Sequence, residues 1–273
     1  MTQRFDLHCH TLFCDGKNTP EEMVLAAVSR GLSCLGFSAH SYTFFDESYC
    51  LARSRQDEYR REIDALRVKY AHDIDVLCGI EQDLFSREPV SGWDYVIGSA
   101  HYILAGGTYV PVDEAPEILE SAADRYFSGS LCALAEAYFE TAARIPEETG
   151  ADIIGHFDLI AKFSEQLPLL DEDDGRYASA AEKCLRSLAA SGLPLEINTG
   201  AISRGLRSVP YPSPRYWELI AKLDIPVCLS SDSHSAGTLA FGFERWQAEA
   251  ECAGLHLLTE PPVKKPLTPV HIS

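Results

Sequence analysis

RFDLHCH, residues 4–10, is a short apolar segment that ends in two histidines. Side chains at positions i and i+2 of a strand share a face, so His8 and His10 can bind one ion together while Cys9 packs on the opposite side. Asp15 follows in a polar loop, where it could act as a further ligand or cap a turn. The stretch therefore predicts a first β-strand that carries metal ligands at its carboxyl end.

The same combination of an apolar strand and a terminal polar side chain recurs along the chain. The further segments are CLGFSAH (34–40), DVLCGIE (75–81), DYVIGSAH (94–101), DIIGH (152–156), PLEINTG (194–200) and PVCLSSDSH (226–234). All but PLEINTG end in candidate ligands, which are His40, Glu81, His101, His156, Asp232 and His234. A single buried histidine is usually an ordinary core residue, but such a series at consecutive strand ends indicates a multinuclear metal site.

Helical segments are expected between the strands. TPEE (19–22) reads as a capping box with proline at the first helical position, and its helix ends near Gly31. Residues 51–71 form a charged amphipathic helix, and the long segment 114–148 has room for two helices. The remaining helices are expected at about 175–191, 213–223 and 238–253.

Strict alternation of strand and helix predicts a parallel sheet with helical crossovers. Seven such units favour a TIM-like (β/α)7 barrel, one strand short of the TIM barrel, in which the chemistry occupies the C-terminal ends of the strands. The proposed ligands all fall at those ends. We therefore expect one α/β barrel domain spanning residues 1–273, with a metal site at the C-terminal ends of its strands and an irregular tail at 261–273.

Composition and charge narrow the classes of function. The formal net charge of −18 argues against a nucleic-acid-binding protein, which needs clustered Lys and Arg to hold the phosphate backbone. The sequence shows no evident signal peptide and no apolar run of the roughly 20 residues that cross a bilayer. The nine cysteines lack CxxC spacing and are best explained as reduced thiols. These features predict a cytoplasmic protein without a membrane or nucleic-acid partner.

The donor atoms indicate both the metal and the reaction. Imidazole and carboxylate ligands without thiolate suit zinc, manganese or iron, and nine ligands suggest two or three divalent ions. Such ions lower the pKa of a bound water, supply hydroxide as the nucleophile and polarise a phosphoryl group. We therefore expect hydrolysis of a small phosphorylated substrate. No catalytic group is assigned beyond the metal-bound hydroxide, and the general acid is left open.

The ordered set of motifs resembles the polymerase-and-histidinol-phosphatase (PHP) superfamily over about residues 3–245. It comprises DLHCH (6–10), Asp15, His40, Glu81, His101, His156 and SDSH (231–234). The motifs that resemble the histidinol-phosphatase branch are GIEQD (79–83), GSAHY (98–102), GHFD (155–158) and EINTG (196–200). The resemblance implies a distorted seven-stranded barrel, commonly three metals, and hydrolysis of L-histidinol phosphate to L-histidinol and phosphate in histidine biosynthesis.

The resemblance also implies how the ligands are shared among the ions. One ion would be bound by His8, His10, Glu81 and Asp232, a second by Glu81, His101 and His156, and a third by Asp15, His40 and His234. Many relatives have a histidine where this chain has Asp15, so the third group departs from the pattern of the family.

Basic residues after the fifth and sixth strands are candidates for binding the phosphate. By the same resemblance Arg204 has this role and Lys162 a similar one, while Arg207 competes with Arg204 in the loop AISRGLRSVPYPS (201–213). Each of these cations could equally be a solvated surface residue.

Other polar side chains directly follow the ligands. Tyr42 and Tyr102 each lie just beyond a candidate ligand, where they could pack against an imidazole ring on the substrate side of the site. Asp83 and Asp158 follow ligands as well and could orient them by accepting hydrogen bonds.

Three other interpretations stay open at this point. A PHP-type phosphoesterase or exonuclease acting on nucleotides or single-stranded nucleic acid would use the same ligands, although the acidic balance disfavours it. An amidohydrolase-type enzyme also begins with HxH, but usually carries a bridging lysine on a later strand, where this chain offers Glu81 and His101. A non-enzymatic metal-binding protein would keep the ligands and hydrolyse no phosphoester.

Overall fold

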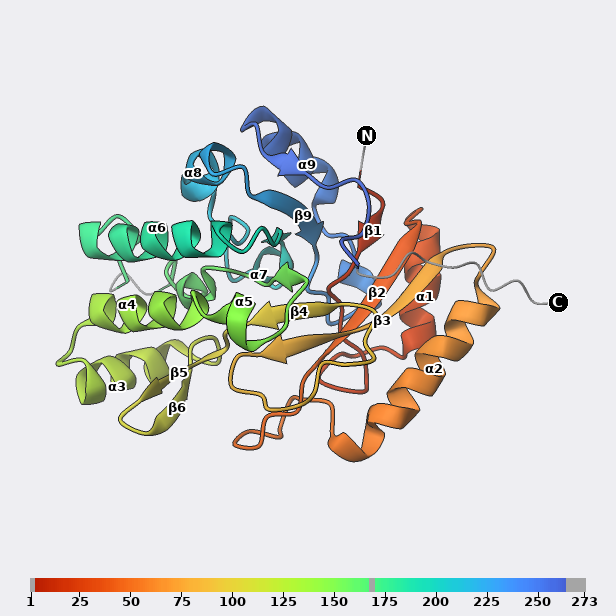
Figure 1. Ribbon diagram of the computed structural model, residues 1–273, viewed down its shortest axis with the longest axis horizontal. Coiled ribbons are helices and arrows are strands. Elements are labelled where there is room, and N and C mark those ends of the chain that lie inside the picture. The colour runs from red at the N-terminus through yellow and green to blue at the C-terminus, as the bar shows by residue number, and fades with distance from the viewer. Residues whose placement is uncertain (1–2, 167–169, 264–273) are drawn as a thin grey trace.

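Figure 1 shows the computed structural model of the chain, which describes residues 3–166 and 170–263. A curled eight-stranded parallel sheet runs through it in the order β1-β2-β3-β4-β7-β8-β9-β10. The strands are β1 (Phe5–Asp6), β2 (Cys34–His40), β3 (Asp75–Asp83), β4 (Val96–Ser99), β7 (Ile153–Ile154), β8 (Leu195–Asn198), β9 (Pro226–Ser230) and β10 (His256–Leu257). All seven predicted strands are present, and β10 is an eighth that the sequence analysis did not predict.

β1 and β9 do not form a continuous ladder of backbone hydrogen bonds. They are joined by a few separate contacts, and the barrel is distorted there. β10 pairs with the start of β9, so β1 cannot lie along that part of the edge. Farther along, the side-chain amide of Gln3 bonds to the backbone of Leu229 on both sides, with distances of 2.7 and 2.9 Å. At the far end Cys9 and Ser233 form a parallel bridge. This last contact brings the segments that carry the first and last predicted ligands together.

Tyr95 fills the interior of the barrel. Its side chain is fully buried, and its hydroxyl donates a hydrogen bond to the carbonyl oxygen of Leu7 at 2.5 Å. The ring leaves no room for side chains on β2 and β3, because a Cβ atom at Gly36 or at Gly79 would lie only 2.4 Å from atoms of Tyr95. Two glycines on neighbouring strands are therefore explained by one aromatic ring, from the residue just before β4.

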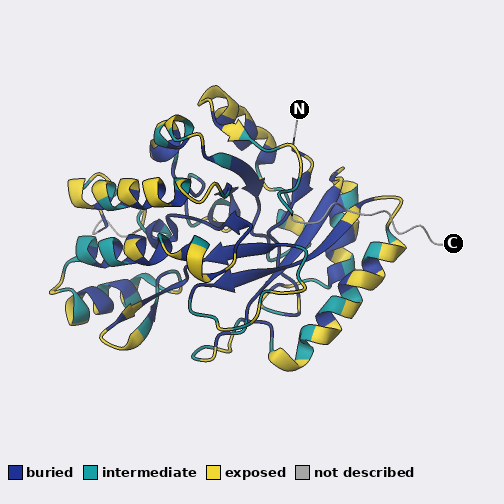
Figure 2. Ribbon diagram, in the orientation of Figure 1, coloured by how far each residue is buried: buried dark blue, intermediate teal, exposed yellow. Residues whose placement is uncertain are grey.

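Helices cover the sheet, and Figure 2 shows that their outward faces are exposed while the strands of the sheet other than β10 are largely buried. They are α1 (Pro20–Ser29), α2 (Gln56–Lys69), α3 (Pro116–Tyr126), α4 (Leu131–Ala142), α5 (Ile145–Glu148), α6 (Gly175–Ala189), α7 (Gly200–Ser203), α8 (Trp217–Lys222) and α9 (Phe243–Cys252). The predicted capping box of α1 is confirmed, with Thr19 and Glu22 each bonding the other's backbone N–H. No helix among the described residues is long and apolar enough to cross a bilayer.

The prediction of two helices for residues 114–148 was wrong, because the segment forms three. It is preceded by an antiparallel hairpin of β5 (Tyr102–Ala105) and β6 (Thr108–Pro111), whose tight turn uses Gly106 and Gly107 at positive φ. The hairpin packs against α3 and α4, as the lower left of Figure 1 shows. This insertion places the hairpin beside the ends of β3 and β4.

Three predicted helices begin later than expected. The 3-10 turns at Arg53–Arg55 and Pro214–Tyr216 precede α2 and α8, and α9 starts only at Phe243 because Ala240 and Gly242 adopt left-handed backbone conformations. In the predicted tail, residues 264–273 lie outside the described residues.

Candidate functional site

The nine predicted ligands gather at the carboxyl ends of the parallel strands. Their donor atoms fall into four overlapping groups, in each of which all donors lie within 4.8 Å of one another. The groups are His10 with Asp15, His40 and His234; His8 with Glu81 and His156; His8 with His10 and Asp232; and His40 with Glu81 and His101. The convergence predicted from the strand ends is therefore present in the tertiary structure, while binding of metal by these residues stays a prediction.

Glu81, near the end of β3, lies at the centre of the set. Its Oε2 atom is 2.8 Å from His40 Nδ1 and 3.3 Å from His8 Nε2. Its Oε1 atom is 2.9 Å from His156 Nε2 and 3.2 Å from His101 Nε2. A carboxylate in this position can bridge two ions.

His10 joins this centre to the outer part of the site. Its ring stacks between those of His40 and His234, with both centroid separations at 4.2 Å. Asp15 approaches the same group, with Oδ2 3.0 Å from His234 Nε2 and a side chain that is 33% exposed. The outer group is thus more accessible to solvent than the group around Glu81, which is fully buried.

Several nitrogen and oxygen atoms in the centre that could bind a metal have no hydrogen-bond partner among the described residues. These buried atoms include His8 Nε2, His10 Nε2, His40 Nδ1 and Glu81 Oε2. Leaving a buried polar atom without a partner costs roughly 1–3 kcal/mol, so a cluster of them needs a compensating ligand. Imidazole nitrogens and carboxylate oxygens that face one another fit a divalent cation such as zinc, manganese or iron.

The charges of the cluster favour ionised carboxylates. Burial opposes ionisation of Glu81, but the positive charge of His8, His40 and His101 outweighs it and holds the pKa of Glu81 well below its usual range. Burial and the neighbouring charges of His234 and His40 lower the pKa of His10 to about 3. At neutral pH this ring is therefore neutral and can offer a lone pair to a cation.

Glu196 on β8 accepts hydrogen bonds from two candidate ligands, His8 and His156, and the sequence analysis assigned it no role. His8 donates from Nδ1 to Glu196 Oε1 at 2.7 Å, which turns Nε2 of the ring toward Glu81. The other oxygen of Glu196 accepts from the backbone N–H of His156 and from the side chain of Asn198. A carboxylate behind a ligating imidazole fixes its tautomer and orientation. Two polar residues at i and i+2 in an otherwise apolar buried strand were the available signal.

The two predicted orienting aspartates behave differently. Asp83 Oδ2 accepts the backbone N–H of His101 at 3.1 Å and lies 3.3 Å from its Nδ1 atom, as expected for an orienting group. Asp158 instead accepts the backbone N–H of Ser213 at 3.0 Å, and burial raises its pKa to about 7. It lies in the loop after β7, where the charge of Arg207 acts on it.

A cavity of about 420 Å³ opens onto the cluster. The predicted site residues that line it are Asp15, His40, His101, Tyr102, His156, Lys162, Arg204, Asp232 and His234. Further lining residues, which the sequence analysis did not assign, include Asp46, Ser48, Tyr49, Asp113 and Glu114. The cavity is therefore lined by candidate metal ligands and by additional carboxylates.

Arg204 lies in this cavity next to the candidate ligands. Its guanidinium contacts Asp232 Oδ2 at 3.2 Å and the backbone oxygen of Asp232 at 3.1 Å. This close approach requires Gly200, where a Cβ atom would lie 2.8 Å from Asp232 Oδ2 and 3.0 Å from Arg204 Nη2. Asp232 itself has a φ of 45°, a left-handed conformation that is uncommon for this residue type and typical of functional sites.

Lys162 also reaches the cavity, but its charge is partly neutralised there. Its ammonium donates to the backbone oxygen of Asp113 at 2.7 Å and to Asp113 Oδ2 at 3.0 Å. Asp113 was not assigned from the sequence because it lies in the insertion, away from any predicted strand end.

Arg207 and Tyr42 are not brought to the cavity, contrary to their prediction as substrate-side residues. Arg207 is buried, where it bonds the backbone of Ala161 and lies 3.3 Å from Glu172. The Tyr42 hydroxyl donates to Glu47 at 2.7 Å. The residue that packs edge-on against the imidazole of His40 is Tyr49, at 4.9 Å, because the loop after β2 folds back over the site.

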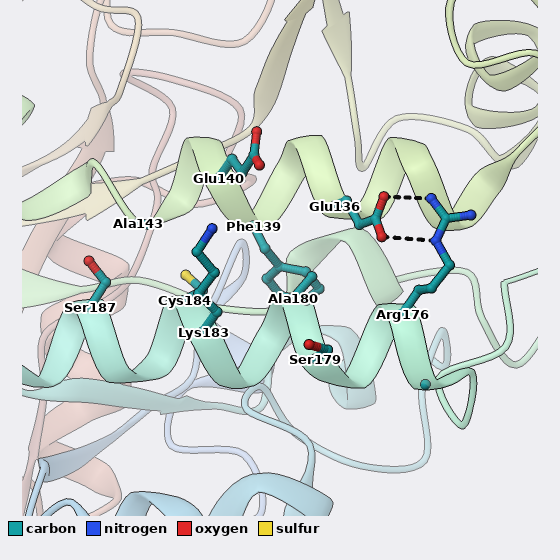
Figure 3. Close-up of a pocket in the computed structure, with 11 residues that line it drawn as sticks. Glu136, Phe139, Glu140, Ala143, Arg176, Ser179, Ala180, Lys183, Cys184 and Ser187 are labelled. Atoms are coloured by element: carbon teal, nitrogen blue, oxygen red, sulfur yellow. Dashed lines mark hydrogen bonds and ion pairs between the residues drawn. The ribbon is translucent and has the colours of Figure 1, made fainter.

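A second hollow, of about 660 Å³, lies between α4 and α6 and contains no predicted site residue (Figure 3). Its floor is formed by Phe139, Ala180 and Cys184, and Glu136 and Arg176 form an ion pair across one end. It carries no cluster of metal-binding side chains among the described residues. The candidate metal ligands lie at the other cavity.

Comparisons with known proteins agree with this picture. The PHP domain family model matches residues 6–200. A Deinococcus radiodurans protein named as a probable histidinol-phosphatase is 33% identical over 89% of this chain and 91% of its own length.

Two crystal structures share the fold. The HisK protein of Listeria monocytogenes has a TM-score of 0.76 at 21% identity, covering 89% of this chain and 99% of its own. Histidinol phosphate phosphatase from Lactococcus lactis, determined with zinc, L-histidinol and phosphate, has a TM-score of 0.70 at 20% identity and covers 94% and 96%. The predicted fold class and the predicted family are both confirmed. Because the family match extends over most of the chain and includes all but the last of the predicted ligand motifs, the chain belongs to the PHP domain family.

Proposed function

We propose that the chain is a metal-dependent phosphomonoesterase that hydrolyses L-histidinol phosphate to L-histidinol and phosphate. The observation that carries the proposal is the convergence of nine imidazole and carboxylate groups in overlapping clusters, with buried nitrogen and oxygen atoms that lack a hydrogen-bond partner, at a cavity that Arg204 also lines. The Deinococcus relative, similar over nearly its whole length, and the Lactococcus structure with L-histidinol and phosphate support the choice of substrate. Hydrolysis of this ester belongs to histidine biosynthesis.

Two or three divalent ions, of zinc, manganese or iron, would be held by the nine candidate ligands. They are His8, His10, Asp15, His40, Glu81, His101, His156, Asp232 and His234. When bound, such ions lower the pKa of a water molecule and neutralise charge on the phosphoryl group. Zinc in the Lactococcus structure supports one of these choices.

The side chains around the cluster orient the substrate. Arg204 offers N–H groups to phosphate oxygens, and Asp232 holds the guanidinium in place. Lys162 contributes a point charge whose orientation is set by Asp113. Tyr49 and Tyr102 line the cavity and contribute aromatic ring surface to it.

Phosphate release tests the proposed function directly. We expect the protein loaded with manganese or zinc to release phosphate from L-histidinol phosphate in preference to sugar and nucleotide monophosphates. Chelation should abolish the activity and re-addition of metal should restore it. Hydrolysis of other phosphoesters alone would contradict the substrate, and degradation of labelled single-stranded DNA would favour the exonuclease alternative. No hydrolysis with any metal would contradict the whole proposal.

Arg204 provides a test of how the phosphate is held. Arg204→Met is expected to raise KM for the phosphate ester about tenfold or more, because a charge-assisted contact worth roughly 1.5–3 kcal/mol is lost. Bound metal should stay unchanged, measured by elemental analysis beside steady-state kinetics. Arg186→Met removes the same charge from an exposed arginine that pairs with Glu182, and serves as the control. Unchanged kinetics in the Arg204 variant would rule out its role.

The remaining features of the proposal concern the whole chain. We place residues 1–273 in one domain, and the protein in the cytoplasm. All nine cysteines are free thiols, which supports a reducing compartment. The acidic surface supports a small-molecule substrate over a nucleic acid.

A further inference from the structure

Three carboxylates that are not candidate metal ligands line the cavity and come from two segments. The loop 41–52 after β2 contributes Asp46, and the hairpin with the segment after it contributes Asp113 and Glu114. Their charges are opposite in sign to that of Arg204, which also lines the cavity. A ligand that contacts both kinds of side chain carries negative charge at one end and positive charge at the other.

Most of the lining carboxylates already have a cationic partner. Asp113 binds Lys162, Asp232 binds Arg204, and Asp15 lies 3.0 Å from His234. Glu114 is exposed to solvent. None of these offers a buried, unneutralised charge to a ligand.

Asp46 differs from these carboxylates, because it is held firmly by neutral donors alone. Its Oδ1 atom accepts hydrogen bonds from the backbone and the hydroxyl of Ser48, at 3.1 and 2.7 Å. Its Oδ2 atom accepts one from the Tyr102 hydroxyl at 2.9 Å. Partial burial opposes ionisation, but these hydrogen bonds outweigh it and lower the pKa of Asp46. No Lys, Arg or His among the described residues lies within ion-pair distance of its carboxylate.

The loop that carries Asp46 is fixed by aromatic contacts. Phe45 stacks on Tyr109 of the hairpin at 3.8 Å with nearly parallel planes, and meets Tyr102 edge-on at 4.8 Å. Thr43 donates from its hydroxyl to the backbone oxygen of Asp46. The carboxylate is therefore preorganised, and a cation can bind without first ordering the loop.

We propose that Asp46 determines specificity by binding a cationic nitrogen on the alcohol portion of the phosphate ester. The inference rests on the proposed function and extends it, since it names the residue that recognises the part of the substrate that does not react. The phosphate occupies the side of the candidate ligands and Arg204, while Asp46 selects esters whose alcohol carries a protonated amine or an imidazolium. Uncharged alcohols lack this contact and bind less well.

The test compares the metal-loaded wild type with Asp46→Asn and Glu47→Gln. Asparagine keeps an acceptor for Ser48 and a polar group for Tyr102, so the loop should hold. Glu47 is the adjacent carboxylate, but it bonds Tyr42 and does not line the cavity, so its variant is a matched loss of charge. The substrates are L-histidinol phosphate, phosphoethanolamine with its isosteric neutral partner n-propyl phosphate, and p-nitrophenyl phosphate.

We expect Asp46→Asn to lower kcat/KM for L-histidinol phosphate about tenfold or more, mainly through KM. The preference for phosphoethanolamine over n-propyl phosphate should fall by a similar factor. Activity on p-nitrophenyl phosphate should change less than about twofold, and Glu47→Gln should behave as the wild type. A loss that is equal for charged and neutral substrates, or no loss at all, would overturn the assignment of Asp46.

Failure of the proposed function would be visible separately. If the wild type cleaves p-nitrophenyl phosphate but not L-histidinol phosphate, the biosynthetic substrate is wrong. The ratio between phosphoethanolamine and n-propyl phosphate still decides the role of Asp46 in that case. A ratio of the two kcat/KM values near one in the wild type would overturn the inference. A ratio well above one in the wild type that falls to near one in Asp46→Asn would support it.

Discussion

Glu81→Gln should lower kcat/KM for the phosphate ester about a thousandfold or more, which corresponds to about 4 kcal/mol of transition-state stabilisation. Glu81 is the carboxylate nearest to four imidazoles at once, with distances between 2.8 and 3.3 Å. Glutamine has the same shape but lacks the negative charge, and its NH₂ group cannot ligate a cation. We therefore expect bound metal to fall together with activity.

Elemental analysis of the purified variant and steady-state kinetics with added metal would measure these two effects. Glu148→Gln is a suitable control, because Glu148 lies on the surface and pairs only with Arg144 in the same helical turn. Normal metal content with normal turnover in Glu81→Gln would contradict the assignment of the site. The substitution is isosteric and keeps the shape of the site, and thermal unfolding of the variant and wild-type apoproteins, measured side by side, separates loss of metal from loss of fold.

Tyr95→Ala is expected to lower the free energy of unfolding by about 3–5 kcal/mol, the range for deleting a large buried aromatic ring. The ring fills the barrel between β2 and β3, and no other side chain can replace it because Gly36 and Gly79 face it. Tyr95→Phe keeps the ring and removes only the hydrogen bond to Leu7, so it should cost about 1 kcal/mol.

Urea unfolding of both variants, with chelator present throughout, would measure these differences. Chelation is necessary because bound metal stabilises the folded state by mass action and would mask changes in the core. A loss below about 1 kcal/mol for the alanine variant would contradict the role of Tyr95 as the packing centre of the barrel.

Eight of the nine candidate ligands could be predicted from a local signal, because they lie at or just after the end of a strand. Asp15 lies in a loop, where a turn cap was the alternative. His8 and His10 share a face through the period of two along a strand, and the carboxyl ends of parallel strands meet at one edge of a sheet. Neither argument depends on the conformation of a loop. The closure between Cys9 and Ser233 then brings the first and last of these segments together.

For residues outside that pattern, the sequence could not show which ones lie in the cavity or contact a candidate ligand. Arg204 and Arg207 lie three positions apart in one loop, yet one faces the cavity while the other is buried against Glu172. Their environments depend on where helix α7 and the loop after β7 pass, which no local periodicity encodes. Tyr42 and Tyr49 differ for the same reason, because the fold of the loop after β2 decides which ring meets His40.

The sequence by itself therefore determined the parallel α/β architecture, the family and the set of candidate ligands, since short periodic patterns specify which side chains leave each strand and at which end. Only the tertiary structure decided the surroundings of those ligands. Glu196 behind His8, Asp46 across the cavity and the glycines opposite Tyr95 all act through contacts between distant segments. Burial and charge compensation arise from such contacts, and they exist only once the chain has folded.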